Sequence, residues 1–365
     1  MKKLFAILLS LVIAAAGTAC ISAEYKEGEK LKSGSYTYVI RGGKAQIIRY
    51  NGKEKNVVVP SRINGYIVDK VGSDVELITG IGSSKADVDE NGYYEDREKS
   101  GFEKTKVESV VIPDTVTEIG INCFADCEKL RRIILSKNLK FIPAEMCSGC
   151  KALKNIKIPD KVTEICAYAF GQTAIRIIKI PDSVRVINTD SFGDKLTNIS
   201  CAKGNKRFSS QNGVLYNKKK TKLLNYPMSK PDKSFKIPKT VREIGVNSIS
   251  SQKYLEKLIV SKGVRRMDKG ALLHCEKLRK LELNPRGKKK IVFEKGAFEY
   301  CKKLKKVNLP ASAVLENRSL GYYDIGLSSE GDYPTKIKGF TIYGVKGSPA
   351  EKYAAKNGFR FIAVN

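Results

Sequence analysis

Histidine is almost absent from this 365-residue chain, which contains only His274. His274 precedes Cys275, and neighbours in a turn rarely let an imidazole face a thiol, so we expect no Cys–His catalytic pair. Cys147 and Cys150 have the spacing of half a zinc site, but no second cysteine pair or histidine pair follows at ligand spacing. The shortage of histidine therefore argues against a cysteine-based active site and against structural zinc.

Other signatures of enzymes are missing as well. No glycine-rich phosphate loop of the required spacing precedes a helix. Glu118, Glu164 and Glu243 share one register, but a surface ladder does not provide the two opposed carboxylates that a glycosidase cleft needs. The sequence therefore predicts no catalytic residues and a protein that is not an enzyme.

Acidic residues are scarce relative to basic ones, 38 against 67, and the formal net charge is +29. Such a field attracts polyanions without choosing among them. We expect an acidic extracellular protein or glycan as partner, and no nucleic acid as a specific partner. A solvated, highly soluble surface is the alternative for most individual lysines.

Long apolar runs are confined to the N-terminus. Residues 4–16 are apolar, follow a basic start and lead to small residues up to Ala23, which predicts a secretory signal peptide over 1–23. A lipoprotein signal with lipid on Cys20 is the alternative, although Gly17 stands where an aliphatic residue is preferred. No later segment is apolar for 18 residues, so we expect a secreted or cell-surface protein without a transmembrane segment in the mature chain.

What the chain has in abundance is a phrase that recurs about every 23 residues. Its clearest copy starts at Leu153 and continues through Ile158, Pro159, Val162 and Ile165. Further copies start at Val107, Leu130, Ile175, Leu196, Leu255, Leu278 and Leu304. Alternating apolar residues predict a strand, proline marks its end, and a compact apolar corner follows. A fixed short period predicts a β-rich solenoid of parallel strands.

The phrase resembles the BspA-like leucine-rich repeats of bacterial cell-surface and secreted proteins. That family's pattern is roughly L-x-x-I-x-I-P-x-x-V-x-x-I-G-x-x-A-F-x-x-C-x-x-L, which residues 107–130 follow almost letter for letter. Cys147, Ile249 and Leu272 replace the corner Phe, and Thr173 replaces the corner Cys. The resemblance covers about residues 36–364 and implies extracellular adhesion or ligand binding, with no fixed set of binding residues.

The breaks in the repeat predict the domain organisation. The predicted segments are the signal peptide 1–23, an N-terminal hairpin cap with the first coil at 24–72, an acidic insert at 73–105, repeats at 106–316 with a hairpin insertion at 204–229, and a C-terminal cap at 317–365. The hairpin should project from the surface with a Lys218–Lys220 tip. In the cap, a capping box at Ser348 and Glu351 should start a short helix.

The cysteines beyond Cys20 predict buried core fillers. Cys127, Cys150, Cys275 and Cys301 share one corner position of their repeats. A free cysteine behaves as a small buried hydrophobe. Disulfides between adjacent repeats are the alternative for an exported protein.

Residues 87–98 have the spacing of a calcium loop. The oxygen ligands would be Asp87, Asp89, Asn91, the carbonyl of Tyr93 and Glu98. Because no good helix precedes the loop, a polar loop without metal is the alternative. The sequence predicts no other cofactor.

The outward strand positions predict a curved binding surface on a monomer. They mix bases, amides and aliphatic groups, and the polar members proposed to contact a ligand are Arg132, Asn155, Lys157, Lys179, Lys257, Lys280 and Lys306. An extended acidic partner would suit such a surface. The other function considered is a structural envelope protein held on anionic wall polymers.

Overall fold

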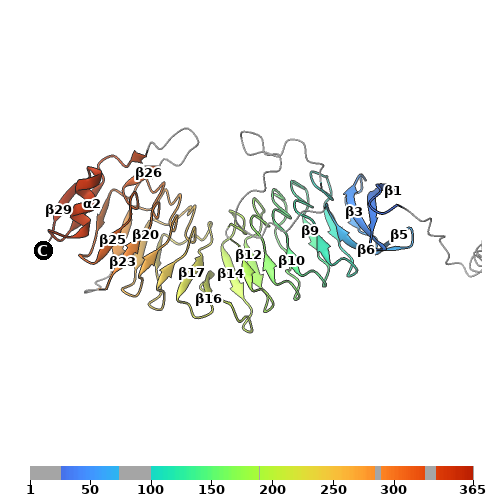
Figure 1. The fold of residues 1–365 in the computed structure, drawn as a ribbon, viewed down its shortest axis with the longest axis horizontal. Coiled ribbons are helices and arrows are strands. Elements are labelled where there is room, and N and C mark those ends of the chain that lie inside the picture. Colours follow the sequence, from blue (N-terminus) through green and yellow to red (C-terminus); the bar gives the residue numbers. More distant parts are fainter. Residues whose placement is uncertain (1–25, 74–99, 189, 284–288, 325–333, 365) are drawn as a thin grey trace, which may run out of the picture.

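The computed structural model describes residues 26–73, 100–188, 190–283, 289–324 and 334–364. The predicted signal peptide, Cys20 and the calcium-loop residues 87–98 lie outside the described residues. The chain forms one elongated stack of coils with a cap at each end, as Figure 1 shows. In the described part, no helix has both the length and the apolar character needed to cross a membrane.

Two rows of short parallel strands run along the stack. The first row, called the strand face here, consists of β4 (Asn56–Val58), β7 (Ser109–Val111), β9 (Arg132–Ile134), β12 (Ile177–Ile180), β14 (Asn198–Cys201), β18 (Ser234–Lys236), β20 (Lys257–Val260), β22 (Lys280–Leu283), β24 (Lys306–Asn308), β28 (Thr341–Gly344) and β29 (Arg360–Ala363). Neighbouring strands pair one coil apart, as Ser109 does with Arg132. The prediction of parallel strands with a period near 23 is confirmed.

The second row, called the return face, closes each coil. Its strands are β6 (Tyr66–Val71), β8 (Glu118–Ile119), β10 (Phe141–Ile142), β11 (Glu164–Ile165), β13 (Val186–Ile187), β17 (Lys222–Asn225), β19 (Glu243–Ile244), β21 (Arg266–Met267), β23 (Ile291–Phe293) and β25 (Ala313–Leu315). Between β9 and β12, the strand expected around residues 155–157 is not formed. The strand face therefore lacks the ladders on both sides of this coil, to β9 and to β12.

The N-terminal cap is the expected hairpin. β2 (Tyr36–Arg41) and β3 (Lys44–Tyr50) pair antiparallel, with β1 (Leu31–Ser33) on the outer edge of β2. Gly42 and Gly43 both adopt positive φ, 52° and 70°, as a tight turn requires. β3 then pairs parallel with β6, and β5 (Arg62–Ile63) pairs antiparallel with β6, so the cap begins the return face.

Each coil has one corner residue that fills the core, called its plug. The plugs are Phe102, Phe124, Cys147, Phe170, Phe192, Tyr226, Ile249, Leu272, Phe298 and Leu320, all of them buried. The N–H of Phe124, for example, donates to the carbonyl of Met146 at 2.9 Å, next to the plug of the following coil. Two residues before most plugs, the backbone turns with positive φ, as at Asn122 (56°) and Tyr168 (53°).

The acidic insert was expected to extend to residue 105, but residues 100–105 pack as the first corner of the stack. Phe102 is fully buried and stacks between Tyr50 (4.7 Å) and Phe124 (5.2 Å). Gly101 and Phe102 lie 22 residues before the corner at Phe124. The repeat spacing could therefore have identified this corner.

The tip of the 204–229 hairpin is exposed at Lys218 and Lys219, but its strands divide the core, which was not predicted. β16 (Val214–Asn217) pairs antiparallel with β15 (Phe208–Gln211) on one side and with β17 on the other. Leu215 packs into the core of the N-terminal half, whereas Val214 and Tyr216 pack into that of the C-terminal half. The tip residue Lys218 donates to the carbonyl of Lys203 at 3.2 Å instead of extending freely.

The C-terminal cap contains the expected helix, with Pro349 at its first position, but the predicted capping box is not formed. α2 (Pro349–Asn357) ends at Gly358 in the left-handed conformation. Ser348 makes no side-chain cap, and its buried Oγ has no partner among the described residues. Glu351 instead accepts from the N–H of Gly347 at 2.5 Å. Next to the cap, β26 (Tyr322–Asp324) pairs antiparallel with β27 (Thr335–Lys336).

The cysteines from Cys123 to Cys301 are free thiols, as expected for core fillers. The corner cysteines also donate hydrogen bonds, which the sequence did not predict. Cys127 Sγ donates to the Phe102 carbonyl at 2.9 Å, and Cys150 Sγ to the Phe124 carbonyl at 3.0 Å. Each corner thiol thus ties its coil to the plug of the preceding coil.

Alkylation of the native protein should separate these thiols by burial. Burial raises the pKa of Cys127 to about 12 and those of the half-buried Cys166 and Cys201 to about 11, and only the thiolate reacts. We expect iodoacetamide at pH 8 to modify Cys166 and Cys201 first and Cys127 only after unfolding, measured by peptide mass spectrometry against a denatured sample. Labelling of native Cys127 as fast as Cys201 would contradict the burial.

Candidate functional site

The residues predicted to bind a ligand lie on the strand face or, for Asn155 and Lys157, in the segment without a strand between β9 and β12. Arg132, Lys257, Lys280 and Lys306 follow the strand-opening apolar residue by two positions, and Lys157 and Lys179 follow it by four. Asn155 belongs to the first of these two rows, and all but the half-buried Lys257 are exposed. The alternation of inward and outward side chains along a strand predicts both of these rows of outward positions.

The structure adds Lys236 and Asn56 to the same two rows. Lys236 is exposed at the end of β18, and Asn56 is exposed at the start of β4. Both could have been found by reading the outward positions of the coil that opens at Asp232 and of the coil before Val107.

Acidic side chains of the protein itself neutralise some of the strand-face cations and leave others unpaired. In the C-terminal half, Glu282 lies 2.7 Å from Lys280 and 2.9 Å from Lys257, and these contacts lower its pKa. Among the described residues, no ion pair includes Arg132, Lys157 or Lys179. Glu282 therefore compensates Lys257 and Lys280, whereas Arg132, Lys157 and Lys179 in the N-terminal half and Lys236 and Lys306 in the C-terminal half have no ion pair among the described residues.

Exposed aliphatic side chains accompany these cations. Val58 is 71% exposed, Ile177 60% and Ile134 40%, and all three point outward from the strand face. Contiguous exposed apolar groups rimmed by polar residues are typical of interaction sites. The N-terminal half of the strand face thus combines uncompensated charge with apolar contact area.

Two grooves lie where the strand-face ladder is interrupted. One, of about 460 Å³, is lined by Lys157, Lys179 and the turn residue Asp182. The other, of about 600 Å³, separates β22 from β24 and is lined by Lys280 and Lys306. Each groove is thus flanked by two of the predicted ligand-binding lysines.

The return face carries a network of ion pairs. Lys222 contacts Glu243 and lies 3.4 Å from Asp268, which Arg266 contacts at 3.0 Å. Burial and the neighbouring Glu243 carboxylate raise the pKa of Asp268 to about 6. The acids here are matched by bases, so the network ties neighbouring coils together.

The structure separates His274 from its neighbour Cys275. His274 is exposed and stacks on Tyr300 with ring centres 4.1 Å apart. The Cys275 thiol is buried and donates to the Ile249 carbonyl at 2.8 Å. Within the described ranges, no group of three or more His, Cys, Asp and Glu side chains is placed to hold a metal ion.

Comparison with known proteins agrees with this architecture. Residues 96–221 and 228–323 match the model of the BspA type leucine rich repeat region, in six copies. A leucine-rich cell surface protein from Faecalibacterium prausnitzii is 21% identical, with a TM-score of 0.53 over 93% of this chain and 96% of that one. The pneumococcal vaccine antigen PcpA is 18% identical, with a TM-score of 0.57 over 93% of this chain and all of that one. No curated protein matches the sequence.

Proposed function

This chain belongs to the BspA-type leucine-rich repeat family, and we propose that it is an exported, monomeric binding or adhesion module that captures acidic extracellular proteins or glycans on its strand face. The observation that carries the proposal is the group of Arg132, Lys157 and Lys179. These cations are exposed, have no ion-pair partner among the described residues and lie beside exposed aliphatic groups. An extended anion could contact several coils at once.

The basic start and apolar run of residues 1–23 support export, with either a free mature chain or a lipid on Cys20. The name of the Faecalibacterium prausnitzii protein places that protein at a cell surface, which is consistent with such a route. Mass spectrometry of the exported chain would distinguish a cleaved N-terminus from a lipidated Cys20.

Removing these three cations should weaken anion binding. We expect Arg132, Lys157 and Lys179 changed to Ser to lower affinity for heparin or polyglutamate about tenfold, because each exposed contact contributes roughly 0.2–1 kcal/mol. The salt dependence of binding should weaken in parallel. Titration at two salt concentrations, followed by calorimetry, measures both effects.

The matched control changes Lys257 and Lys280 to Ser. Glu282 already engages both lysines, so this variant should lose less affinity than the triple variant. If the triple variant bound both polyanions as tightly as the unmodified protein, the strand-face proposal would fail.

The second candidate function is that of a structural envelope protein held on anionic wall polymers. The net charge of +29 favours it, because it needs only non-specific attraction. A wash at about 0.5 M NaCl screens exposed ion pairs. Release of the protein from intact cells by this wash, with no loss of affinity in the triple variant, would favour the envelope role over capture.

A further inference from the structure

One coil of the stack is short at its corner. In the regular coils, five residues lead from the return strand to the plug, as from Ile187 to Phe192 and from Ile244 to Ile249. In the coil that contains the hairpin, only three residues lead from Leu223 to the plug Tyr226. The hydrogen bond from the Tyr226 N–H to the Ser248 carbonyl fixes this register. Two corner residues are therefore missing.

The missing residues belong to the positive-φ corner. Asp190 (φ 58°) and Asn247 (φ 50°) each lie two residues before a plug and occupy this corner in the coils on either side. At the corner of the short coil, no residue from Leu224 to Tyr226 has a positive φ. The deletion thus opens the corner wall between Asp190 and Asn247.

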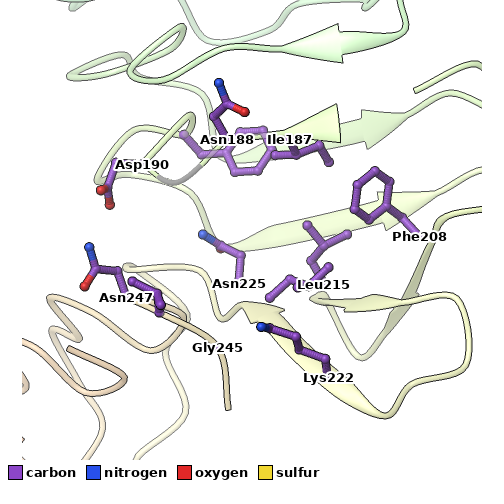
Figure 2. Close-up of a pocket in the computed structure, with 12 residues that line it drawn as sticks. Ile187, Asn188, Asp190, Phe208, Leu215, Lys222, Asn225, Gly245 and Asn247 are labelled. Atoms are coloured by element: carbon purple, nitrogen blue, oxygen red, sulfur yellow. The ribbon is translucent and has the colours of Figure 1, made fainter. Parts of the chain in front are cut away.

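A pocket of about 310 Å³, called the junction pocket here, occupies this opening. Its size lies at the lower end of the range of small-molecule sites, and such sites combine apolar walls with a few convergent polar groups. Figure 2 shows Asp190 and Asn247 facing each other at one end and Phe208 with Leu215 at the other. The pocket therefore has the carboxylate and amide at one end and the apolar pair at the other, and the polar side chains of Asn225 and Lys222 also line it.

The polar end carries a carboxylate without a cationic partner. Asp190 is half-buried, burial raises its pKa, and the side-chain amide of Asn247 faces it. The lysine that lines the pocket, Lys222, is engaged by Glu243 and Asp268. Among the described residues, no ion pair includes Asp190. A desolvated carboxylate of this kind is best satisfied by a cation that donates hydrogen bonds.

We propose that the junction pocket binds a primary ammonium group carried on an apolar stem. The ammonium donates to Asp190, and the stem packs against Phe208 and Leu215. The ligand is a lysine side chain of a partner or a free alkyl or aryl amine. This site lies on the return side of the junction and is independent of anion capture on the strand face.

Calorimetric titration of the full chain with phenethylamine tests the proposal. We expect saturable binding of the amine, and at least tenfold weaker binding of its neutral isostere phenylethanol and of the anionic analogue phenylpropionate, which lack the cation. Asp190→Asn should lower the affinity for phenethylamine about ten- to a hundredfold, because a charge-assisted hydrogen bond is lost. Phe208→Leu should weaken binding of the amine and should not tighten binding of phenylethanol or phenylpropionate.

The matched control is Glu145→Gln, which removes a carboxylate from the same corner position two coils earlier. It should leave amine binding unchanged.

A blocked hexapeptide with one lysine, compared with its norleucine counterpart, distinguishes a lysine side chain of a partner from a free amine as the ligand. Lysine-peptide binding tighter than phenethylamine assigns the site to a protein side chain, and weaker binding assigns it to a free amine.

Equal affinity for the amine, phenylethanol and phenylpropionate would overturn the proposal. Equal affinity of Asp190→Asn and the unmodified protein for the amine, or no saturable amine binding, would also overturn it. Melting curves of each variant show whether it is folded. Heparin binding tests the strand face, and amine binding tests the junction pocket. A negative result in one experiment therefore does not affect the other proposal.

Discussion

Tyr216→Ala should destabilise the C-terminal half of the stack by about 3–5 kcal/mol while leaving most of the N-terminal half folded. The Tyr216 side chain is almost fully buried and belongs to the C-terminal core. In a solenoid each coil contacts only its neighbours, so a cavity acts mainly on the coils next to it. Hydrogen exchange followed by mass spectrometry should show lost protection in β19 and β21 before β10 and β11.

Leu215→Ala supplies the matched comparison, because Leu215 is the adjacent residue of β16 and points into the other core. We expect a loss of about 2–5 kcal/mol that reduces protection in β11 and β13 first. Opposite patterns in the two variants would demonstrate that β16 is a wall between two cores. Equal loss of protection along the whole chain in both variants would mean that the stack unfolds as one unit, contrary to this expectation.

The sequence was informative about features that depend on local pattern. Alternating apolar residues and the position of proline determine where a strand starts and ends, so the outward positions of Arg132, Lys179 and Lys306 could be predicted. The expected strand at residues 155–157 did not form. Strand assignment depends on ladder hydrogen bonds with the next coil as well as on alternation.

Features that depend on a neighbouring coil were beyond local reasoning. The thiol of Cys150 donates to a carbonyl 26 residues earlier, a partner that composition does not reveal. Whether Lys280 is available depends on its contact with Glu282, and Lys257 reaches the same carboxylate from the preceding coil. Outward direction was predictable, whereas the charge balance of the surface required the packed coils.

The roles of the hairpin and the junction pocket were hidden for a different reason. The apolar residues Val214, Leu215 and Tyr216 of the insertion predict a strand. That its two faces pack into different cores is visible only when the coils on both sides are in place. The short corner before Tyr226 becomes visible once β17 is aligned with β19. From sequence spacing alone, the hairpin is an insertion of extra residues. The absence of two residues from the corner before Tyr226 cannot be recognised in that way.

Phe102→Ala should be among the most damaging changes in the N-terminal half, with an expected cost of about 3–5 kcal/mol. Phe102 is the first plug, is fully buried and stacks on Tyr50 of the cap and Phe124 of the next coil. Its loss opens a cavity between cap and repeats. We expect increased hydrogen exchange in β3 and β8 and a lower midpoint of thermal unfolding.

Phe102→Leu is the control, because leucine fills the plug position at Leu272 and Leu320. It should cost less than the alanine variant, since most of the apolar volume remains. The double variant of Phe102 and Phe124 to Ala then measures the stacking itself. If the rings act as one column, the two losses should differ from additivity by roughly 0.5–1.5 kcal/mol. Strictly additive losses of stability, with unchanged hydrogen exchange in β3, would contradict this column. Residues 100–105 would then behave as part of the insert and not as the first corner of the stack.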